Sequence, residues 1–160
     1  MKNIKIILIL YITIIIQGCV SGLEQNTMRT ANHNVIGNNQ PYEYILEKET
    51  DKARFYSNTK LRGEVGESIT KNSKELENDI MKGIFGKCNY TIFDLIETRI
   101  IPSEIPTFKE IWVFKDEKSE MKDKTTALGI TMKQLPNNGG VDIFITGDCP
   151  VKIKSIIFGK

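Results

Sequence analysis

The feature that most constrains the fold is a pair of alternating segments near the C-terminus. Leu128, Ile130 and Met132 alternate with polar or small residues, as do Val141, Ile143 and Ile145 with Asp142 and Thr146. Between them lies the sequence PNNGG at residues 136–140. A period of two is typical of half-buried strands, and a short Asn- and Gly-rich turn joins antiparallel neighbours. We therefore predict a β-hairpin here, and with it an antiparallel sheet.

The rest of the chain after residue 41 is interpreted as short strands and one helix. The helix is predicted over 72–83, because Leu76, Ile80 and Ile84 recur at intervals of four and Asn72 is a favourable N-cap. Its single apolar stripe requires packing against a sheet or a loop. Further strands are predicted at Tyr42–Leu46, Arg54–Ser57, Leu61–Val65, Cys88–Ile101, Phe108–Phe114 and Val151–Phe158.

The expected fold class is β-rich α+β, with an all-β fold as a close alternative. No regular alternation of strands and helices, which parallel sheets require, is visible in the sequence. We expect a small antiparallel sheet, curled into a sandwich or half-barrel, with one helix against it. The 40% hydrophobic and 26% charged residues are typical of a globular chain, and the length fits one domain over 41–160. Trp112, flanked by apolar neighbours, is expected in the core.

The N-terminus has the pattern of a secretory signal peptide. Lys2 and Lys5 precede an 11-residue segment, Ile6–Ile16, that is apolar except for Thr13. A segment of this length is too short to span a bilayer core of about 30 Å, which needs roughly 20 apolar residues. An apolar segment of this kind behind two lysines therefore indicates export.

The residues that follow resemble the lipobox of bacterial lipoproteins. Ile16, Gly18 and Cys19 match that motif, whereas Gln17 departs from the small residue usually found there. The resemblance covers residues 1–19 only. It implies a signal peptide over 1–18, cleavage before Cys19, a diacylglyceryl thioether on the Cys19 sulfur and a fatty acid such as palmitate on its amine. An ordinary signal peptide with a cysteine near its cleavage site is the alternative.

This resemblance implies a protein anchored to a membrane by lipid. Two or three acyl chains anchor durably, because each buried CH₂ contributes about 0.8 kcal/mol. Val20 stands where lipoproteins retained in the inner membrane typically have Asp, which implies the outer membrane, facing the periplasm of a Gram-negative bacterium. Residues 19–40 are rich in Asn and lack any hydrophobic period, so we expect a lipidated flexible tether that includes His33.

Two further cysteines, Cys88 and Cys149, are present in the chain. Export places thiols in an oxidising compartment, where a pair of cysteines favours a disulfide bond. Two unrelated buried thiols remain the alternative.

The sequence contains no recognisable catalytic, metal-binding or cofactor-binding set. Removing residues 1–18 takes Lys2 and Lys5 from the 22 basic residues and leaves 20 against 20 acidic residues, so nucleic acid is not an expected partner. His33 is the only histidine, which argues against zinc sites and His-dependent nucleophiles. A glycosidase would need a pair of carboxylates on either side of a cleft. The candidates are Glu97, Glu104, Asp142 and Asp148, but nothing in the sequence places two of them close together.

The leading functional hypothesis is a non-enzymatic lipoprotein of the outer membrane. Its small domain would act by binding, or as a structural component of the cell envelope, with an envelope protein or cell-wall partner. Two alternatives stay open. The first is an envelope hydrolase that acts on peptidoglycan or another glycan, and the second is an assembly subunit of a secretion or pilus system.

Overall fold

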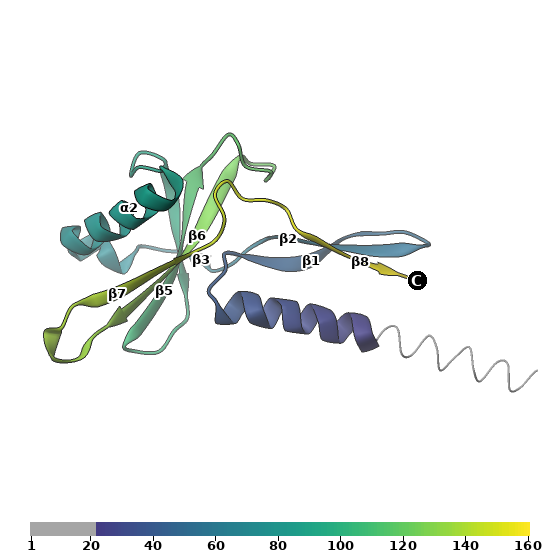
Figure 1. Cartoon of the computed structure of the whole chain (residues 1–160), viewed down its shortest axis with the longest axis horizontal. Helices are drawn as coiled ribbons and strands as arrows, with labels where there is room; N and C mark the ends of the chain where they lie inside the picture. Colours follow the sequence, from purple (N-terminus) through teal and green to yellow (C-terminus); the bar gives the residue numbers. More distant parts are fainter. Residues whose placement is uncertain (1–21) are drawn as a thin grey trace, which may run out of the picture.

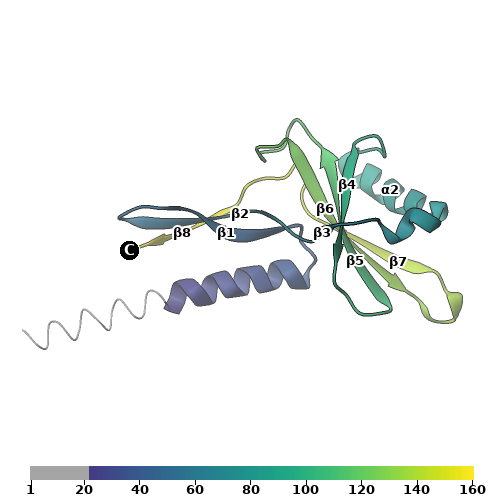
Figure 2. The ribbon, with the colours of Figure 1, turned by 180° about the vertical axis from the view of Figure 1, so that it is seen from behind.

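The computed structural model describes residues 22–160, which form two antiparallel sheets and two helices. The molecule is elongated and has two parts (Figures 1 and 2). We call one part the stalk; it contains the helix of residues 22–37 and the three-stranded sheet β1-β2-β8. We call the other part the head; it contains the five-stranded sheet β3-β4-β5-β6-β7 and helix α2, which covers the sheet on the side away from the stalk.

The elements follow the chain in an order that leaves the stalk, builds the head and returns to the stalk. They are β1 (Tyr42–Glu49), β2 (Ala53–Leu61), β3 (Glu64–Val65), the 3₁₀ turn η1 (Ile69–Asn72), α2 (Lys74–Cys88), β4 (Leu95–Ile101), β5 (Thr107–Lys115), β6 (Thr125–Gln134), the 3₁₀ turn η2 (Pro136–Asn138), β7 (Val141–Thr146) and β8 (Ser155–Gly159).

This architecture confirms the predicted β-rich α+β class. All paired neighbours in both sheets run antiparallel. The strands are divided between two open sheets, where one curled sheet was expected. The predicted hairpin is confirmed as β6 and β7, joined through η2, with Gln134 opposite Val141 and Gly129 opposite Thr146.

The core of the head lies between α2 and the five-stranded sheet. Trp112 is only 1% exposed, as predicted, and its ring N–H donates to the buried Glu110 carboxylate at 2.8 Å. The other carboxylate oxygen accepts the backbone N–H of Ile69 at 2.8 Å, so this buried acid is paired on both oxygens. The buried cluster consists of Ile80, Ile84, Trp112, Phe114, Leu128, Ile130 and Met132.

Helix α2 is later and longer than the range predicted from the sequence. It begins at Lys74, with Ser73 as N-cap, and runs to Cys88, after which Asn89 has a left-handed backbone (φ +62°). The prediction of a strand from Cys88 is therefore wrong at its start. Two glycines inside the helix each cost roughly 0.5–1 kcal/mol relative to Ala. Burial of Ile80 and Ile84 outweighs them, since each buried side chain contributes about 1.5–3 kcal/mol.

Residues 22–37 form a helix, which corrects the flexible tether expected over 19–40. The predicted signal peptide 1–18 and Cys19 lie outside the described residues. Tertiary contacts explain the difference, because Met28 and Val35 are buried. In addition, the Asn32 side-chain amide accepts the backbone N–H of Tyr44 at 2.8 Å and donates to the Tyr44 carbonyl at 3.0 Å. Packing thus stabilises a segment whose local composition does not favour a helix.

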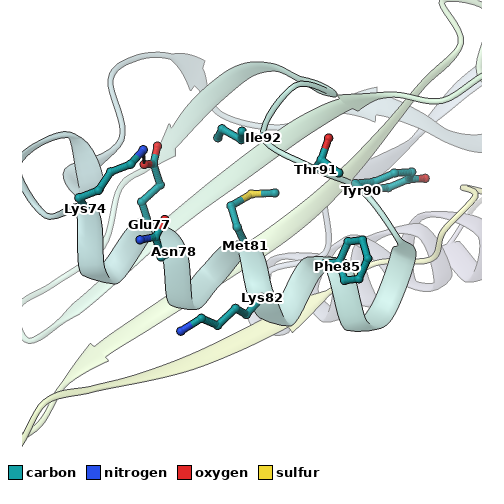
Figure 3. A pocket seen from close by; sticks show the side chains of 9 residues that line it. All are labelled: Lys74, Glu77, Asn78, Met81, Lys82, Phe85, Tyr90, Thr91 and Ile92. Carbon is teal, nitrogen blue, oxygen red and sulfur yellow. Dashed lines mark hydrogen bonds and ion pairs between the residues drawn. The ribbon is translucent and has the colours of Figure 1, made fainter.

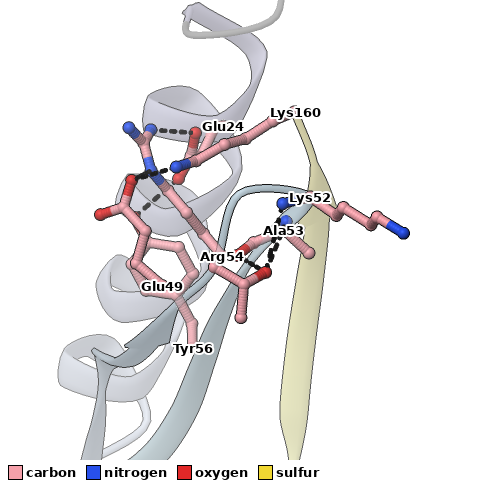
Figure 4. Close-up of polar contacts among 8 residues, drawn as sticks. Glu24, Glu49, Lys52, Ala53, Arg54, Tyr56 and Lys160 are labelled. Carbon is pink, nitrogen blue, oxygen red and sulfur yellow. Dashed lines mark hydrogen bonds and ion pairs between the residues drawn. The ribbon is translucent and has the colours of Figure 1, made fainter.

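Charged and polar side chains fasten the start of this helix to the end of the stalk farthest from the head (Figure 4). The Glu24 carboxylate, 6% exposed, accepts from Arg54 at 2.9 Å and from the Tyr56 hydroxyl at 2.7 Å. Glu49 accepts from Arg54 at 3.1 Å and from Lys160 at 2.6 Å. These bonds join the helix to β1, β2 and the C-terminal residue.

A second cluster holds the stalk to the head. Tyr42, Ile101, Ile111, Val113, Ala127 and Val151 form this buried cluster on the side of the five-stranded sheet opposite α2. The buried Arg62 guanidinium donates to the carbonyls of Gln40 at 2.7 Å and Val35 at 3.4 Å. The Val35 carbonyl also accepts the Gln40 N–H at 2.8 Å, so Arg62 adds a second donor there and ties the segment that follows the first helix to the end of β2.

Candidate functional site

Of the residues predicted to carry chemistry, the structure brings two together. Cys88 and Cys149 form a disulfide bond, with their Cα atoms 5.5 Å apart, which confirms the predicted pair. The bond ties the last residue of α2 to the segment that leads from β7 to β8. Residues 151–154, predicted to begin the last strand, lie outside β8; Val151 packs instead into the cluster between stalk and head.

The candidate site is an apolar groove on the head, between α2 and the segment that follows it (Figure 3). The groove has a volume of about 400 Å³. Most of its lining residues belong to α2, and α2 lies on the side of the five-stranded sheet that faces away from the stalk. Its lining consists of Lys74, Glu77, Asn78, Met81, Lys82, Phe85, Tyr90, Thr91 and Ile92.

A tight turn forms one wall of the groove and presents apolar side chains to solvent. The Thr91 backbone N–H and hydroxyl both donate to the Asp94 carboxylate at 2.8 Å, and these bonds lower the pKa of Asp94. The Asp94 N–H donates to the Thr91 carbonyl at 3.1 Å, which closes the turn. Ile92 and Phe93 occupy its two central positions and are 39% and 95% exposed.

The turn is held in place by Tyr90. Its ring stacks on Phe114, with the ring centroids 5.1 Å apart, and its hydroxyl donates to Asp116 at 2.5 Å. Burial and the bond to Asp116 raise the pKa of Tyr90. Burial alone would raise the pKa of Asp116, but bonds from Tyr90, the Thr126 hydroxyl and the Lys118 N–H lower it. An ionised Asp116 and a neutral Tyr90 therefore fix the turn to the core.

The rim of the groove is charged but balanced. Lys74 pairs with Glu77 one turn along α2 (Figure 3), and Lys82 pairs with Asp79 at 2.9 Å. The bond from Lys82 to Asp79 raises the pKa of Lys82. Neither sign of charge dominates the opening, while the exposed side chains of Phe85 and Phe93 are apolar. The groove is thus suited to an uncharged apolar surface.

The candidate carboxylates from the sequence are dispersed over the head and its loops. Glu97 lies on β4 and pairs with Arg99, whereas Asp142 lies on β7, three strands away. Three strand spacings are about 14 Å, whereas glycosidase carboxylates are about 5–9.5 Å apart. Asp148 pairs with Lys154, and Glu104 lies in the loop before β5.

Within residues 22–160, no group of three or more His, Cys, Asp or Glu side chains is placed to hold a metal ion. The helices of this range include none that is long and apolar enough to cross a membrane.

The sequence alone did not identify the groove. The composition of residues 88–101 predicts one long strand or a bent pair of strands, which would place Ile92 and Phe93 in a sheet. The signal that could have revealed the turn is the spacing of Thr91 and Asp94, since Asp bonds readily to nearby backbone N–H groups.

No family model matches the chain, and neither a curated protein nor a solved structure matches it.

Proposed function

We propose that the protein is a lipoprotein of the Gram-negative outer membrane, which faces the periplasm and whose head acts by binding, without catalysis. The observation that carries this proposal is the order of parts along the molecule. The described chain begins at the end of the stalk farthest from the head, and the apolar groove lies on the opposite side of the head.

The anchor would be acyl chains on Cys19, three residues before Gly22, the first described residue of the helix. A helix of 16 residues is about 24 Å long. With its first turn bonded to Arg54 and Tyr56, this helix is a rigid spacer. The stalk would therefore hold the head at a defined distance from the bilayer, in place of the flexible tether expected from the sequence.

The groove favours another envelope protein as the partner. Exposed aromatic and aliphatic side chains on a rigid turn lose little conformational entropy on binding. A balanced rim favours an apolar protein surface over a strongly charged polymer. Phe93 and Phe85 would be the principal contact residues, as aromatic side chains often are in interfaces.

Two variants test the binding surface in cells that lack the native gene. Phe85→Asp places a charge in the lining of the groove, and we expect it to lose the ability to restore the envelope phenotype. Ile105→Asp is the matched control, because Ile105 is also an exposed apolar residue, at 83% against 54% for Phe85, and does not line the groove. Equal complementation by both variants, at equal protein levels, would contradict the proposed role of the groove.

Cys19→Ser tests the anchor independently. We expect this variant to leave the membrane fraction, and we expect the native protein to carry the mass of the added acyl chains. Membrane association that is unchanged in Cys19→Ser would contradict lipid anchoring. Release of soluble fragments from purified cell wall by the protein would contradict a non-catalytic role.

A further inference from the structure

The outer edge of β8 points to a second binding site, which takes an extended peptide segment. The Asn58 N–H donates to the Lys154 carbonyl at 3.2 Å, and the Lys160 N–H donates to the Lys52 carbonyl at 2.9 Å. Even-numbered residues therefore direct their backbone groups toward β2. Because these directions alternate along an antiparallel strand, Ser155, Ile157 and Gly159 direct theirs away from the sheet. We infer that a partner protein adds a strand at this edge.

The other sheet edges in residues 22–160 are protected, which distinguishes β8 from them. Asn32 occupies both backbone groups of Tyr44 on β1, and the β1–β2 ladder has two register shifts. On β7, the Lys87 ammonium donates to the Ile145 carbonyl at 3.3 Å. The remaining edge strand, β3, is only two residues long. Short strands, bulges and charged side chains are the usual means by which proteins block edge pairing.

Bulges and charged side chains are absent from β8. Its sequence, SIIFG, contains neither charge nor proline, and five consecutive residues pair with β2 without a bulge. Ile157 is 60% exposed and lies opposite Phe55, so an apolar side chain stands beside the free backbone groups. An added strand would therefore gain both hydrogen bonds and side-chain contacts.

The strand is also fixed before any partner arrives. Phe158 packs edge-on against Tyr56, with the ring centroids 5.9 Å apart. The lysines at the two ends of β8 are paired, Lys154 with Asp148 at 2.7 Å and Lys160 with Glu49 at 2.6 Å. The ends therefore do not repel an incoming strand, and little ordering entropy is lost on pairing.

The occupant we infer is a partner protein and not a second copy of this chain. Glu24 bonds to Arg54, which lies opposite Phe158, so the helix begins beside the end of β8. Antiparallel pairing of two β8 strands would place the two helix starts at opposite ends of the dimer. Two copies anchored in one leaflet could not adopt that arrangement, because both helix starts would have to lie near the same membrane surface. This exclusion of a second copy rests on the proposed anchor at Cys19.

The test uses the mature protein in detergent micelles and a synthetic peptide, ARFYSNT, with the sequence of residues 53–59. This sequence already pairs with β8 from the inner side. We expect the peptide to slow amide hydrogen exchange at Ser155, Ile157 and Gly159. A control peptide with Phe55→Pro and Tyr56→Pro lacks N–H groups on both of its edges, and we expect it to have no effect.

A protein variant gives a second measurement. Ile157→Pro removes one outward N–H and leaves the inward bonds of Ile156 and Phe158, so we expect peptide affinity to fall about tenfold. Ile157→Val keeps the N–H and should bind within about twofold of the native protein. If Ile157→Pro fails to fold, the hydrogen-exchange experiment on the native protein still tests whether a peptide binds at the edge of β8.

Three results would overturn the inference. One is no added protection at millimolar peptide, and another is equal protection of the outward amides of β7. The third is protection of the same β8 amides by rising protein concentration alone, because it would assign the edge to a second copy. None of these measurements depends on acylation, so failure here is distinguishable from failure of the lipoprotein proposal.

Discussion

The backbone carbonyl of Asn39 lies against Gly129, so closely that a Cβ built on Gly129 would lie 1.8 Å from the carbonyl oxygen. Asn39 follows the first helix, and Gly129 lies in the middle of β6. The same carbonyl accepts the Thr146 hydroxyl of β7 at 2.8 Å. This contact seats the stalk on the five-stranded sheet at a point where a side chain would prevent it.

We expect Gly129→Ala to destabilise the protein by about 1–3 kcal/mol, the usual cost of overpacking a well-packed site. The added methyl group must displace backbone, which cannot move as freely as a side chain. Urea unfolding followed by circular dichroism measures the change. Gly86→Ala is the control: a methyl group added there would meet no atom within 4 Å, and we expect a gain of about 0.5–1 kcal/mol from helix propensity. Equal midpoints for the two variants would contradict the close contact.

The side chain of Asn39 supplies a second prediction. Its Nδ2 donates to the carbonyls of Glu110 at 3.3 Å and Ile130 at 3.1 Å and to the Thr131 hydroxyl at 3.3 Å. Asn39 has a positive φ of 48°, so Asn39→Gly keeps the backbone conformation and removes these bonds. We expect a loss of about 1 kcal/mol, the usual net contribution of such a hydrogen bond, because the substitution also removes the buried Asn39 Oδ1, which has no hydrogen-bond partner. Unfolding free energies within about 0.5 kcal/mol of the native value would argue against this role, since that is the range of neutral surface changes.

Reduction of the disulfide should weaken the attachment of the C-terminal segment. Cys88 and Cys149 are separated by 61 residues, and the chain-entropy model gives about 4 kcal/mol for a loop of this length. We therefore expect reductant to lower the free energy of unfolding by about 4 kcal/mol, and with it the urea concentration at the midpoint of unfolding. The double variant Cys88→Ala/Cys149→Ala should have the same midpoint with and without reductant. A reductant effect that persists in the double variant would show that another group is responsible.

The buried Tyr42 and the half-buried Tyr90 predict a loss of stability at high pH. Burial raises the pKa of Tyr42 to about 12, although its hydroxyl accepts the Ala127 N–H, and burial also raises the pKa of Tyr90. Both groups favour the neutral form in the folded state. Their contribution is therefore complete below the unfolded pKa of about 10 and is lost as pH rises from about 10 to 12.

For Tyr42 this contribution is about 3 kcal/mol, from a shift of roughly two pH units. Unfolding free energies measured in urea at pH 9, 10 and 11 should fall across that series. Tyr42→Phe should weaken the pH dependence, and absorbance at 295 nm should show delayed ionisation in the native protein. A native protein in which all tyrosines titrate near pH 10 would refute the assignment.

Several features followed from local sequence patterns. The β6–β7 hairpin was predictable because alternation and turn residues act over neighbouring positions. The burial of Trp112 followed from its apolar neighbours. The pairing of Cys88 with Cys149 followed from the count of cysteines and the expected compartment. The candidate groove could not be predicted in this way, because it depends on where α2 ends and the next segment turns.

The order and periodicity of the residues were enough to predict the β-rich class, the hairpin and the cysteine pair. The helix of residues 22–37 could not be predicted in this way, because Met28, Val35 and Asn32 are stabilised by partners distant in the chain. The exposure of Phe93 and the position of β8 at the edge of its sheet likewise follow only from the three-dimensional arrangement. Exposure is a property of what lies beside a residue in space, and a linear pattern of residues does not contain that information.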